Sequence, residues 1–396
     1  MLNTPFSPWP SFTQEEAEAV SQVLLSNKVN YWTGQECRLF EKEFAAWCGT
    51  EYAVALANGT LALDVALKAL NVGHGDEVVV TSRTFLASAS SIVTAGATPV
   101  FADVDLNSQA ITLETILAVI TPKTKAIIVV HLGGMPAEMD SIMDLANRHD
   151  IFVIEDCAQA HGAKYKGKSV GSIGHIGAWS FCQDKIMTTG GEGGMVTTND
   201  KDLWNKMWSY KDHGKSWEAV YEREHPPGFR WLHESFGTNW RMLEMQAVIG
   251  RIQLTRMMEW NKARQYNAEK IRGVCSRYNF LRVPFVPNYI EHAQYKCYVF
   301  VDPNFLPKGW SRDRIIDEIN SRGVPCYQGS CSEVYLEKAF DNTSWRPAKR
   351  LPNAKLLGET SLMFLVHPTL TQGDLELTCS VIENILDQCA KQKESE

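Results

Sequence analysis

Phe152-Val-Ile-Glu-Asp-Cys-Ala-Gln159 is the stretch of sequence that decides the fold. A short apolar run ends there on two acidic residues, without alternation between apolar and polar positions. Unbroken runs of this kind are typical of strands that are buried on both faces of a sheet. The stretch therefore predicts a buried strand over residues 152–155, with Asp156 at its carboxyl end.

Six further apolar runs of the same kind lie between residues 51 and 199, and helix-like stretches separate several of them. Strand alternating with helix is typical of a parallel sheet covered by helices. We therefore expect an α/β fold with a mostly parallel, seven-stranded sheet. The other runs cover residues 53–56, 78–81, 100–103, 126–131, 178–181 and 195–198, and the helix-like stretches cover residues 60–70, 85–95, 113–120 and 140–149.

The sequence changes character after about residue 200. Residues 202–240 read as a tryptophan-rich loop that holds five of the twelve tryptophans. A long helix is expected over residues 243–275, followed by a smaller α+β unit with a strand at 297–301 and helices at 312–322 and 373–388. We place the domain boundary inside the long helix, which gives a large domain (1–250) and a small C-terminal domain (251–396). Before the sheet, Thr13 and Glu16 form a capping-box pattern that predicts an N-terminal helix.

The bulk composition excludes several classes of protein. A net charge of −7 without a long Lys/Arg block argues against a nucleic-acid surface. No segment approaches the ~18 apolar residues that span a bilayer. The first ten residues lack the pattern of a secretory signal, and the ten cysteines form no CxxC pair. We expect a cytoplasmic protein with reduced thiols, no membrane contact and no metal site.

Gly162-Ala-Lys-Tyr-Lys-Gly-Lys-Ser169 matches the phosphate-binding pattern GxxxxGK[ST]. A working P-loop needs a helix that starts at the Lys-Ser pair, because the helix N-terminus holds the phosphates. Gly171 and Gly174 follow too closely for a stable helix. We therefore predict that this match is not a nucleotide site.

Lys185, in Ser180-Phe-Cys-Gln-Asp-Lys185, is the strongest candidate for chemistry. A lysine can form a Schiff base with an aldehyde cofactor, and a buried aspartate such as Asp156 can keep a pyridine nitrogen protonated. Alone, such a lysine is usually a solvated charge, and Asp156 reads equally well as a helix N-cap. Together they predict pyridoxal phosphate chemistry.

Other polar residues follow neighbouring predicted strands, where α/β sheets bind their ligands. Asn58-Gly59-Thr60 precedes a helix and suits an anion, although an ordinary N-cap has the same pattern. Ser180 offers a second hydroxyl for a phosphate. Gln159 and Phe85 are candidates to contact the cofactor ring, although such residues also occur as plain surface and core.

Three weaker candidates for substrate contacts are His131, His161 and Trp32. Residues of these types in such positions are more often structural. A histidine is not required as the base, because the amine of Lys185 can move the proton itself.

Several motifs together resemble the DegT/DnrJ/StrS sugar aminotransferases. They occur in the order of that family, and weaker similarity continues to His367-Pro368. Members of that family are fold-type I pyridoxal phosphate enzymes that act on nucleotide-linked keto sugars, and the resemblance implies the same fold, cofactor and substrate class for this chain. The motifs are Asn58-Gly-Thr-Leu-Ala-Leu63, Val130-His-Leu-Gly-Gly-Met-Pro136, Glu155-Asp-Cys-Ala-Gln-Ala-His-Gly-Ala163, the Lys185 segment with Gly190-Gly-Glu-Gly-Gly194, and Gly237-Thr-Asn-Trp-Arg-Met242.

The resemblance assigns roles by position. It implies that Lys185 carries the cofactor and that Asp156 partners the pyridine nitrogen. Gln159 then lies near the phenolic oxygen and Phe85 stacks on the ring, while Gly59, Thr60 and Ser180 hold the phosphate. Asn239 resembles the residue that reaches the phosphate of the neighbouring subunit's cofactor, which implies a homodimer with shared active sites.

Two positions depart from the commoner family pattern. Gly133 stands where an aromatic residue is frequent, and Cys182-Gln-Asp184 resembles enzymes that aminate 4-keto-6-deoxy sugars for bacterial surface polysaccharides such as the O-antigen of lipopolysaccharide. We expect transfer from L-glutamate to such a sugar. The alternatives are a 3-keto sugar, a sugar dehydratase (a branch in which histidine replaces the lysine), and a non-catalytic regulator of the same fold.

Overall fold

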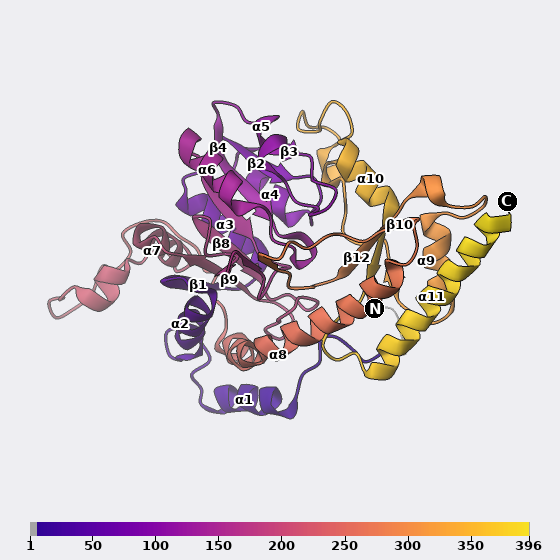
Figure 1. Ribbon diagram of the computed structural model, residues 1–396. Helices are drawn as coiled ribbons and strands as arrows, with labels where there is room; N and C mark the ends of the chain where they lie inside the picture. The colour runs from indigo at the N-terminus through magenta and orange to yellow at the C-terminus, as the bar shows by residue number, and fades with distance from the viewer. Residues whose placement is uncertain (1–5, 396) are drawn as a thin grey trace.

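A seven-stranded sheet forms the centre of the computed structural model, which describes residues 6–395 (Figure 1). The strand order is β1-β9-β8-β5-β4-β2-β3, and β9 is the one strand whose direction is opposite to that of the other six. The predicted α/β fold with a mostly parallel sheet is confirmed. The strands are β1 (Tyr52–Leu56), β2 (Glu77–Thr81), β3 (Thr98–Ala102), β4 (Thr124–Val130), β5 (Phe152–Asp156), β8 (Ile176–Ser180) and β9 (Gly194–Thr198).

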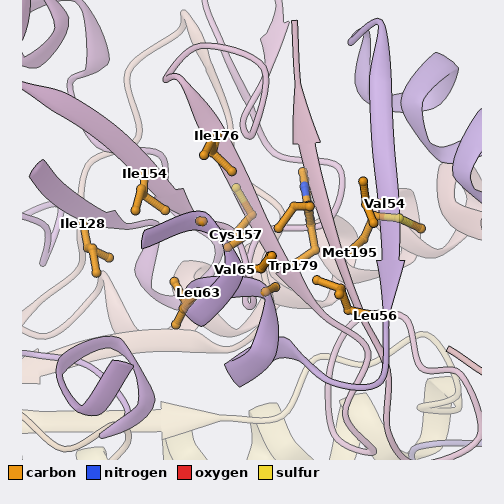
Figure 2. Packing of buried hydrophobic residues seen from close by; sticks show 14 of the residues in the cluster. Val54, Leu56, Leu63, Val65, Ile128, Ile154, Cys157, Ile176, Trp179 and Met195 are labelled. Carbon is orange, nitrogen blue, oxygen red and sulfur yellow. The ribbon is translucent and has the colours of Figure 1, made fainter. Parts of the chain in front are cut away.

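The sheet is buried on both faces, which explains the unbroken apolar runs. Along β4, Ile128 and Val130 belong to one core cluster, whereas Ile127 and Val129 belong to another. The first cluster is closed by α2 (Glu36–Cys48) and by α3 (Gly59–Ala69), which contributes Leu63 and Val65 to it (Figure 2). The second is closed by α5 (Leu113–Leu117) and α6 (Met139–His149).

The C-terminal part forms a second, smaller layer that follows the long helix α8 (Glu244–Cys275). Its four-stranded antiparallel sheet has the order β10 (Leu281–Arg282), β12 (Cys297–Val301), β14 (Ser361–Phe364), β13 (Cys326–Tyr327). Helices α9 (Arg312–Ser321) and α11 (Gln372–Ser395) share its core. The expected long helix, strand and two helices are therefore present. Residue 250 lies within α8, and the domain boundary there stays a prediction.

The N-terminal helix is α1 (Gln14–Leu25), and the predicted capping box is present. The Glu16 carboxylate accepts a hydrogen bond from the Thr13 backbone N–H at 2.7 Å. The first five residues, which entered the argument against a secretory signal, lie outside the described residues. Within residues 6–395, no helix combines the length and the apolar character needed to cross a membrane.

The GxxxxGK[ST] match forms a hairpin. Strands β6 (Lys164–Tyr165) and β7 (Lys168–Ser169) pair antiparallel around Lys166 and Gly167, whose φ angles are +50° and +78°. Strand β11 (Ile290–Glu291) adds to the edge of β6. The pattern thus lies in a hairpin and not at a helix N-terminus, as the glycine spacing predicts.

The loop prediction for residues 202–240 is wrong for residues 202–210, which are helical. Helix α7 (Lys201–Tyr210) begins there because the Asp200 carboxylate caps the N–H groups of Asp202 and Leu203. The glycines and prolines that suggested a loop come only after the helix. Two further short helices are α4 (Ala87–Thr94) and α10 (Pro352–Thr360).

Candidate active site

The candidate residues gather at one edge of the large sheet. Asp156 ends β5 and Ser180 ends β8, and these two strands are direct neighbours. Ser180 also pairs with Gly194, which in turn pairs with Leu56 at the end of β1. The ends of β5, β8 and β1 therefore lie along one edge, which places Asp156 and Ser180 on the same side of the sheet as the Asn58 turn.

The start of α3 lies close enough to Ser180 that only glycine fits at position 59. A Cβ atom on Gly59 would lie 2.5 Å from the Ser180 Cβ. Asn58 caps the helix by accepting a hydrogen bond from Leu61 N at 3.0 Å, and Thr60 is exposed. Backbone N–H groups at a helix start beside two hydroxyls are well suited to a phosphate group.

Asp156 is buried and is held by two hydrogen bonds. Its Oδ2 accepts from Ser88 Oγ at 2.8 Å, and its Oδ1 accepts from Ala158 N at 3.1 Å. Burial raises the pKa of the Asp156 carboxyl group, while Ser88, Ala158 and the charge of Lys185 act in the opposite direction. An acid in this setting gains from a cationic partner such as a pyridinium nitrogen.

Ser88 is a site residue that the sequence analysis missed. It lies in α4, one helical turn after Phe85, and its hydroxyl is 2.8 Å from the Thr84 hydroxyl. Phe85 leaves 71% of its surface exposed, which is unusual for phenylalanine. One turn of chain therefore presents an apolar ring and also fixes the buried carboxylate.

Lys185 is held at its backbone and remains accessible at its amine. Its carbonyl accepts from Trp9 Nε1 at 2.8 Å, and its side chain is 16% exposed. Its Nζ lies 3.7 Å from Asp184 Oδ1 and 5.4 Å from the ring centroid of Tyr295. The Tyr295 hydroxyl donates to Asp184. Trp9 and Tyr295 come from distant parts of the chain, and no sequence motif marked them.

Gln159 and Gly133 form one unit of the site. Gln159 Oε1 accepts from Gly133 N at 2.8 Å, and the Gly133 carbonyl accepts from Tyr295 N at 2.9 Å. Gly133 has a φ of +64°, and a Cβ there would lie 3.1 Å from the Tyr298 ring. This chain therefore has no room for the aromatic residue that is frequent at position 133 in the family.

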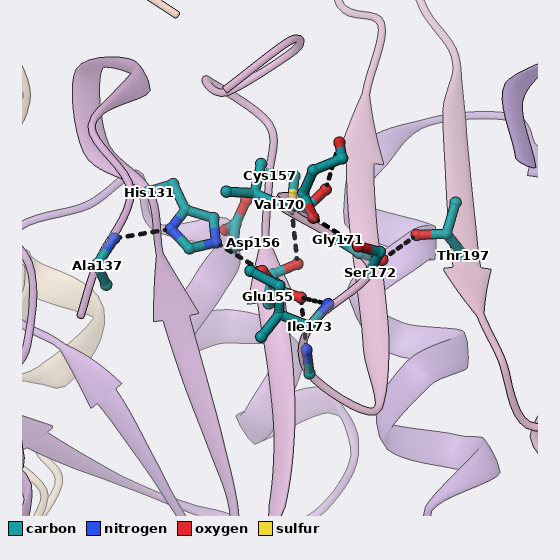
Figure 3. Close-up of polar contacts among 12 residues, drawn as sticks. His131, Ala137, Glu155, Asp156, Cys157, Val170, Gly171, Ser172, Ile173 and Thr197 are labelled. Carbon is teal, nitrogen blue, oxygen red and sulfur yellow. Dashed lines mark hydrogen bonds and ion pairs between the residues drawn. The ribbon is translucent and has the colours of Figure 1, made fainter. Parts of the chain in front are cut away.

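Both histidines are buried in the interior of the large domain. His131 is fully buried: its Nε2 lies 3.0 Å from Glu155 Oε2, and its Nδ1 accepts from Ala137 N (Figure 3). His161 packs against Trp179 and Phe181, and burial lowers its pKa to about 3. His161 is therefore neutral. A substrate contact by either histidine stays a prediction.

Trp32 has aromatic surroundings of its own, whereas Asn239 precedes a residue that lies beside the Asn58 turn: the Trp240 carbonyl accepts from Ala57 N at 3.0 Å. Trp32 packs against Trp208 and Tyr221, with Lys215 Nζ 4.1 Å from its ring centroid. Asn239 is exposed and forms an antiparallel bridge with Asp212, just after α7. The chain between these two residues contains the segment that extends from the body (Figure 1). The predicted roles of both residues involve a substrate or a second subunit.

Comparison with known proteins adds to this geometry. Residues 10–383 match the DegT/DnrJ/EryC1/StrS aminotransferase family. The crystal structure of the aminotransferase from Psychrobacter cryohalolentis is 66% identical, with a TM-score of 0.97 over 98% of this chain and 100% of that chain. The UDP-N-acetyl-3-dehydro-alpha-D-glucosamine 3-aminotransferase of Acidithiobacillus ferrooxidans is 36% identical, over 97% of this chain and 96% of the relative. The GDP-perosamine synthase of Caulobacter vibrioides is also 36% identical, over 88% of this chain and 89% of the relative.

Proposed function

Because this chain belongs to the DegT/DnrJ/EryC1/StrS aminotransferase family and is a pyridoxal phosphate-dependent sugar aminotransferase, we propose that it transfers the amino group of L-glutamate to a nucleotide-linked 4-keto-6-deoxyhexose. The observation that carries the proposal is the buried Asp156 at the end of β5, whose carboxyl group is close enough to Lys185 for the lysine charge to favour its ionisation. The dehydrating branch has histidine in place of this lysine, so Lys185 favours amine transfer.

The residues of the site fit the cofactor. Pyridoxal phosphate supplies an aldehyde that captures an amine and a pyridinium ring that takes up electrons. In this proposal its phosphate occupies the start of α3 beside Ser180, where Gly59 leaves room. Asp156 holds the ring nitrogen, and the exposed Phe85 covers one ring face.

Lys185 has two tasks in the proposed reaction. Its amine binds the cofactor between turnovers, and, once the amino donor displaces it, the same amine removes the α proton of L-glutamate. Asp184, 3.7 Å away, keeps the amine in place. Neither task requires His131 or His161.

The finer substrate assignment has two candidates. The name of the Acidithiobacillus relative specifies a 3-keto nucleotide sugar, which supports a nucleotide-linked keto sugar here and makes 3-amination the second candidate. We favour 4-amination because Cys182-Gln-Asp184, directly before Lys185, resembles enzymes with that specificity. The product would serve a bacterial surface polysaccharide.

We also propose that two copies of the chain share their active sites. Phe229, Trp231 and Phe236 on the extended segment are 75%, 77% and 100% exposed. Apolar exposure of this extent is typical of an interface. The same segment ends at Asn239, which would then reach the partner's cofactor phosphate. Light scattering should give twice the chain mass of 44.5 kDa, and a monomer mass would contradict this proposal.

A panel assay tests the substrate. The purified enzyme is incubated with L-glutamate and with 4-keto and 3-keto sugars linked to dTDP, UDP or GDP, and amino-sugar products are detected by mass spectrometry. We expect product from a 4-keto-6-deoxy sugar and none from Lys185→Ala. Turnover of the 3-keto sugars alone would refute the 4-keto assignment.

A further inference from the structure

Arg264 is a buried cation without an anionic partner. It lies in the middle of α8 and is 1% exposed. Its Nη1 donates to the Tyr295 carbonyl at 3.4 Å, whereas Nε and Nη2 have no hydrogen-bond partner. Within residues 6–395, no carboxylate forms an ion pair with it. A buried guanidinium in this state is costly, unless an anion from outside the chain completes it.

A second cation lies nearby, next to Lys185. Lys296 Nζ is 4.8 Å from the ring centroid of Tyr295, the ring that Lys185 Nζ approaches to 5.4 Å. Burial, together with the charge of Arg264, lowers the pKa of Lys296 to about 8. The cluster of Lys185, Arg264 and Lys296 has three cationic side chains and one carboxylate, that of Asp184, so positive charge is in excess.

Trp9 and Tyr295 connect Arg264 to Lys185, the residue proposed to react. Trp9 donates to the Lys185 carbonyl at 2.8 Å, and its ring lies 5.0 Å from the Arg264 guanidinium carbon. Tyr295 joins the same two residues on the other side, since its carbonyl accepts from Arg264 and its ring contacts Lys185. Arg264 is thus separated from Lys185 by single side chains.

An amino donor brings a carboxylate to this place. Lys185 must reach the α carbon of the donor, and the donor's α-carboxylate is bonded to that carbon. The carboxylate therefore lies within a few ångströms of Lys185. Guanidinium groups bind carboxylates through two parallel hydrogen bonds, and Nε with one Nη provides that pair. These are the two unpartnered nitrogens of Arg264.

We propose that Arg264 and Lys296 form the carboxylate subsite for the amino donor. The inference rests on the proposed aminotransferase function and adds the residues that select the donor. Trp9 covers Arg264, so its indole shifts when the carboxylate enters. The enclosed setting suits a small carboxylate better than the diphosphate of a nucleotide sugar.

Binding of glutarate tests the subsite without chemistry, because glutarate carries two carboxylates and no amine. Isothermal titration of the holoenzyme should show that Arg264→Gln weakens glutarate binding by about 10- to 100-fold, the usual effect of losing a hydrogen bond to a charged group. Lys296→Gln should weaken it in the same direction, and Arg264→Lys should restore part of the affinity. Steady-state kinetics should show a matching rise in KM for L-glutamate, with KM for the nucleotide sugar within about twofold.

Arg282→Gln is the matched control. Arg282 also stacks on an aromatic ring, 4.3 Å from the Phe300 centroid, but it lies in the C-terminal sheet. This variant should bind glutarate normally. If Arg264→Gln does not fold, as judged by its melting temperature, the half-buried Lys296 still provides the test.

Two results would overturn the inference. One is unchanged glutarate affinity in a folded Lys296→Gln or Arg264→Gln variant. The other is a rise in KM for the nucleotide sugar alone, which would assign the cations to the diphosphate. The donor half-reaction, followed by cofactor absorbance after L-glutamate is added without sugar, is independent of the sugar. A wrong sugar assignment therefore leaves this test intact.

Discussion

The two faces of strand β5 at its carboxyl end carry two adjacent buried carboxylates with opposite character. Glu155 accepts hydrogen bonds from His131 Nε2 at 3.0 Å, Ile173 N at 2.9 Å and Gly174 N at 2.7 Å (Figure 3). Burial opposes its ionisation, but the bond from His131 and the backbone donors outweigh burial and lower its pKa. The chain itself therefore supplies the hydrogen-bond donors that the buried Glu155 carboxylate needs.

The Asp156 face is incomplete within the chain. Among the described residues, only Ser88 and Ala158 donate hydrogen bonds to the Asp156 carboxylate, and burial raises its pKa. Successive residues of a strand point to opposite faces, so one peptide step separates Glu155 from the acid to which we assign the cofactor nitrogen. From this difference we infer that the buried charge with too few internal partners belongs to a ligand site, and the proposal for Arg264 uses the same reasoning.

Asp156→Asn should give the largest effect on the reaction. The amide cannot hold the ring nitrogen protonated, so kcat should fall by about 100- to 1,000-fold, the usual range for one preorganised electrostatic group. The cofactor should still bind, because the phosphate contacts remain. Turnover and cofactor absorbance are measured together, and a near-normal kcat would remove the role assigned to Asp156.

Glu155→Gln should instead affect stability. It replaces the carboxylate that accepts the hydrogen bond of His131 Nε2, and the loss of a hydrogen bond to a charged group typically costs about 1.5–3 kcal/mol. Urea denaturation should show this loss, while kcat of the folded variant stays within a few fold of wild type. If kcat collapses and stability does not, the two faces have been assigned the wrong way round.

Ser88→Ala should give a smaller effect on the Asp156 face. Loss of a donor to the carboxylate raises the pKa of Asp156 further, so the carboxylate ionises at higher pH. The acidic limb of the kcat profile should move upward in pH, with about a tenfold loss at its midpoint. Ser88→Thr keeps the hydroxyl and serves as the control. An unshifted limb would show that Ser88 does not act through Asp156.

The pH dependence of stability should give the smallest effect. Glu155 has a lowered pKa in the folded state, so its stabilisation is present above the unfolded value near 4.5 and is lost as pH falls through the folded value. The difference in melting temperature between wild type and Glu155→Gln should therefore shrink below pH 4.5. A difference that widens on acidification would contradict this account.

The large sheet could be predicted from the sequence because each of its strands has a recognisable local pattern. Every predicted strand of that sheet is present, since burial on both faces demands an unbroken apolar run such as the one before Glu155. Because α/β sheets bind ligands at the carboxyl ends of their strands, Asp156, Ser180 and Asn58 could also be predicted to lie at one edge. Helix α7 was missed because its cap, Asp200, precedes a segment that otherwise reads as a loop.

The supporting contacts of the site were not predictable. Trp9, Arg264 and Tyr295 meet only through tertiary packing, and none belongs to a local pattern. Ser88 is one of several serines in its helix, and only the geometry selects it as the partner of Asp156. The steric reason for a glycine at position 133 depends on the position of the Tyr298 ring, which is far along the chain.

Covalent capture of the cofactor tests the central claim most directly. The holoenzyme is reduced with borohydride and digested, and the pyridoxyl-bearing peptide is identified by mass spectrometry. The account predicts a single label on Lys185, and none on the neighbouring Lys296 or the buried Lys211. A label on another lysine, or no label on a protein that shows cofactor absorbance, would contradict it.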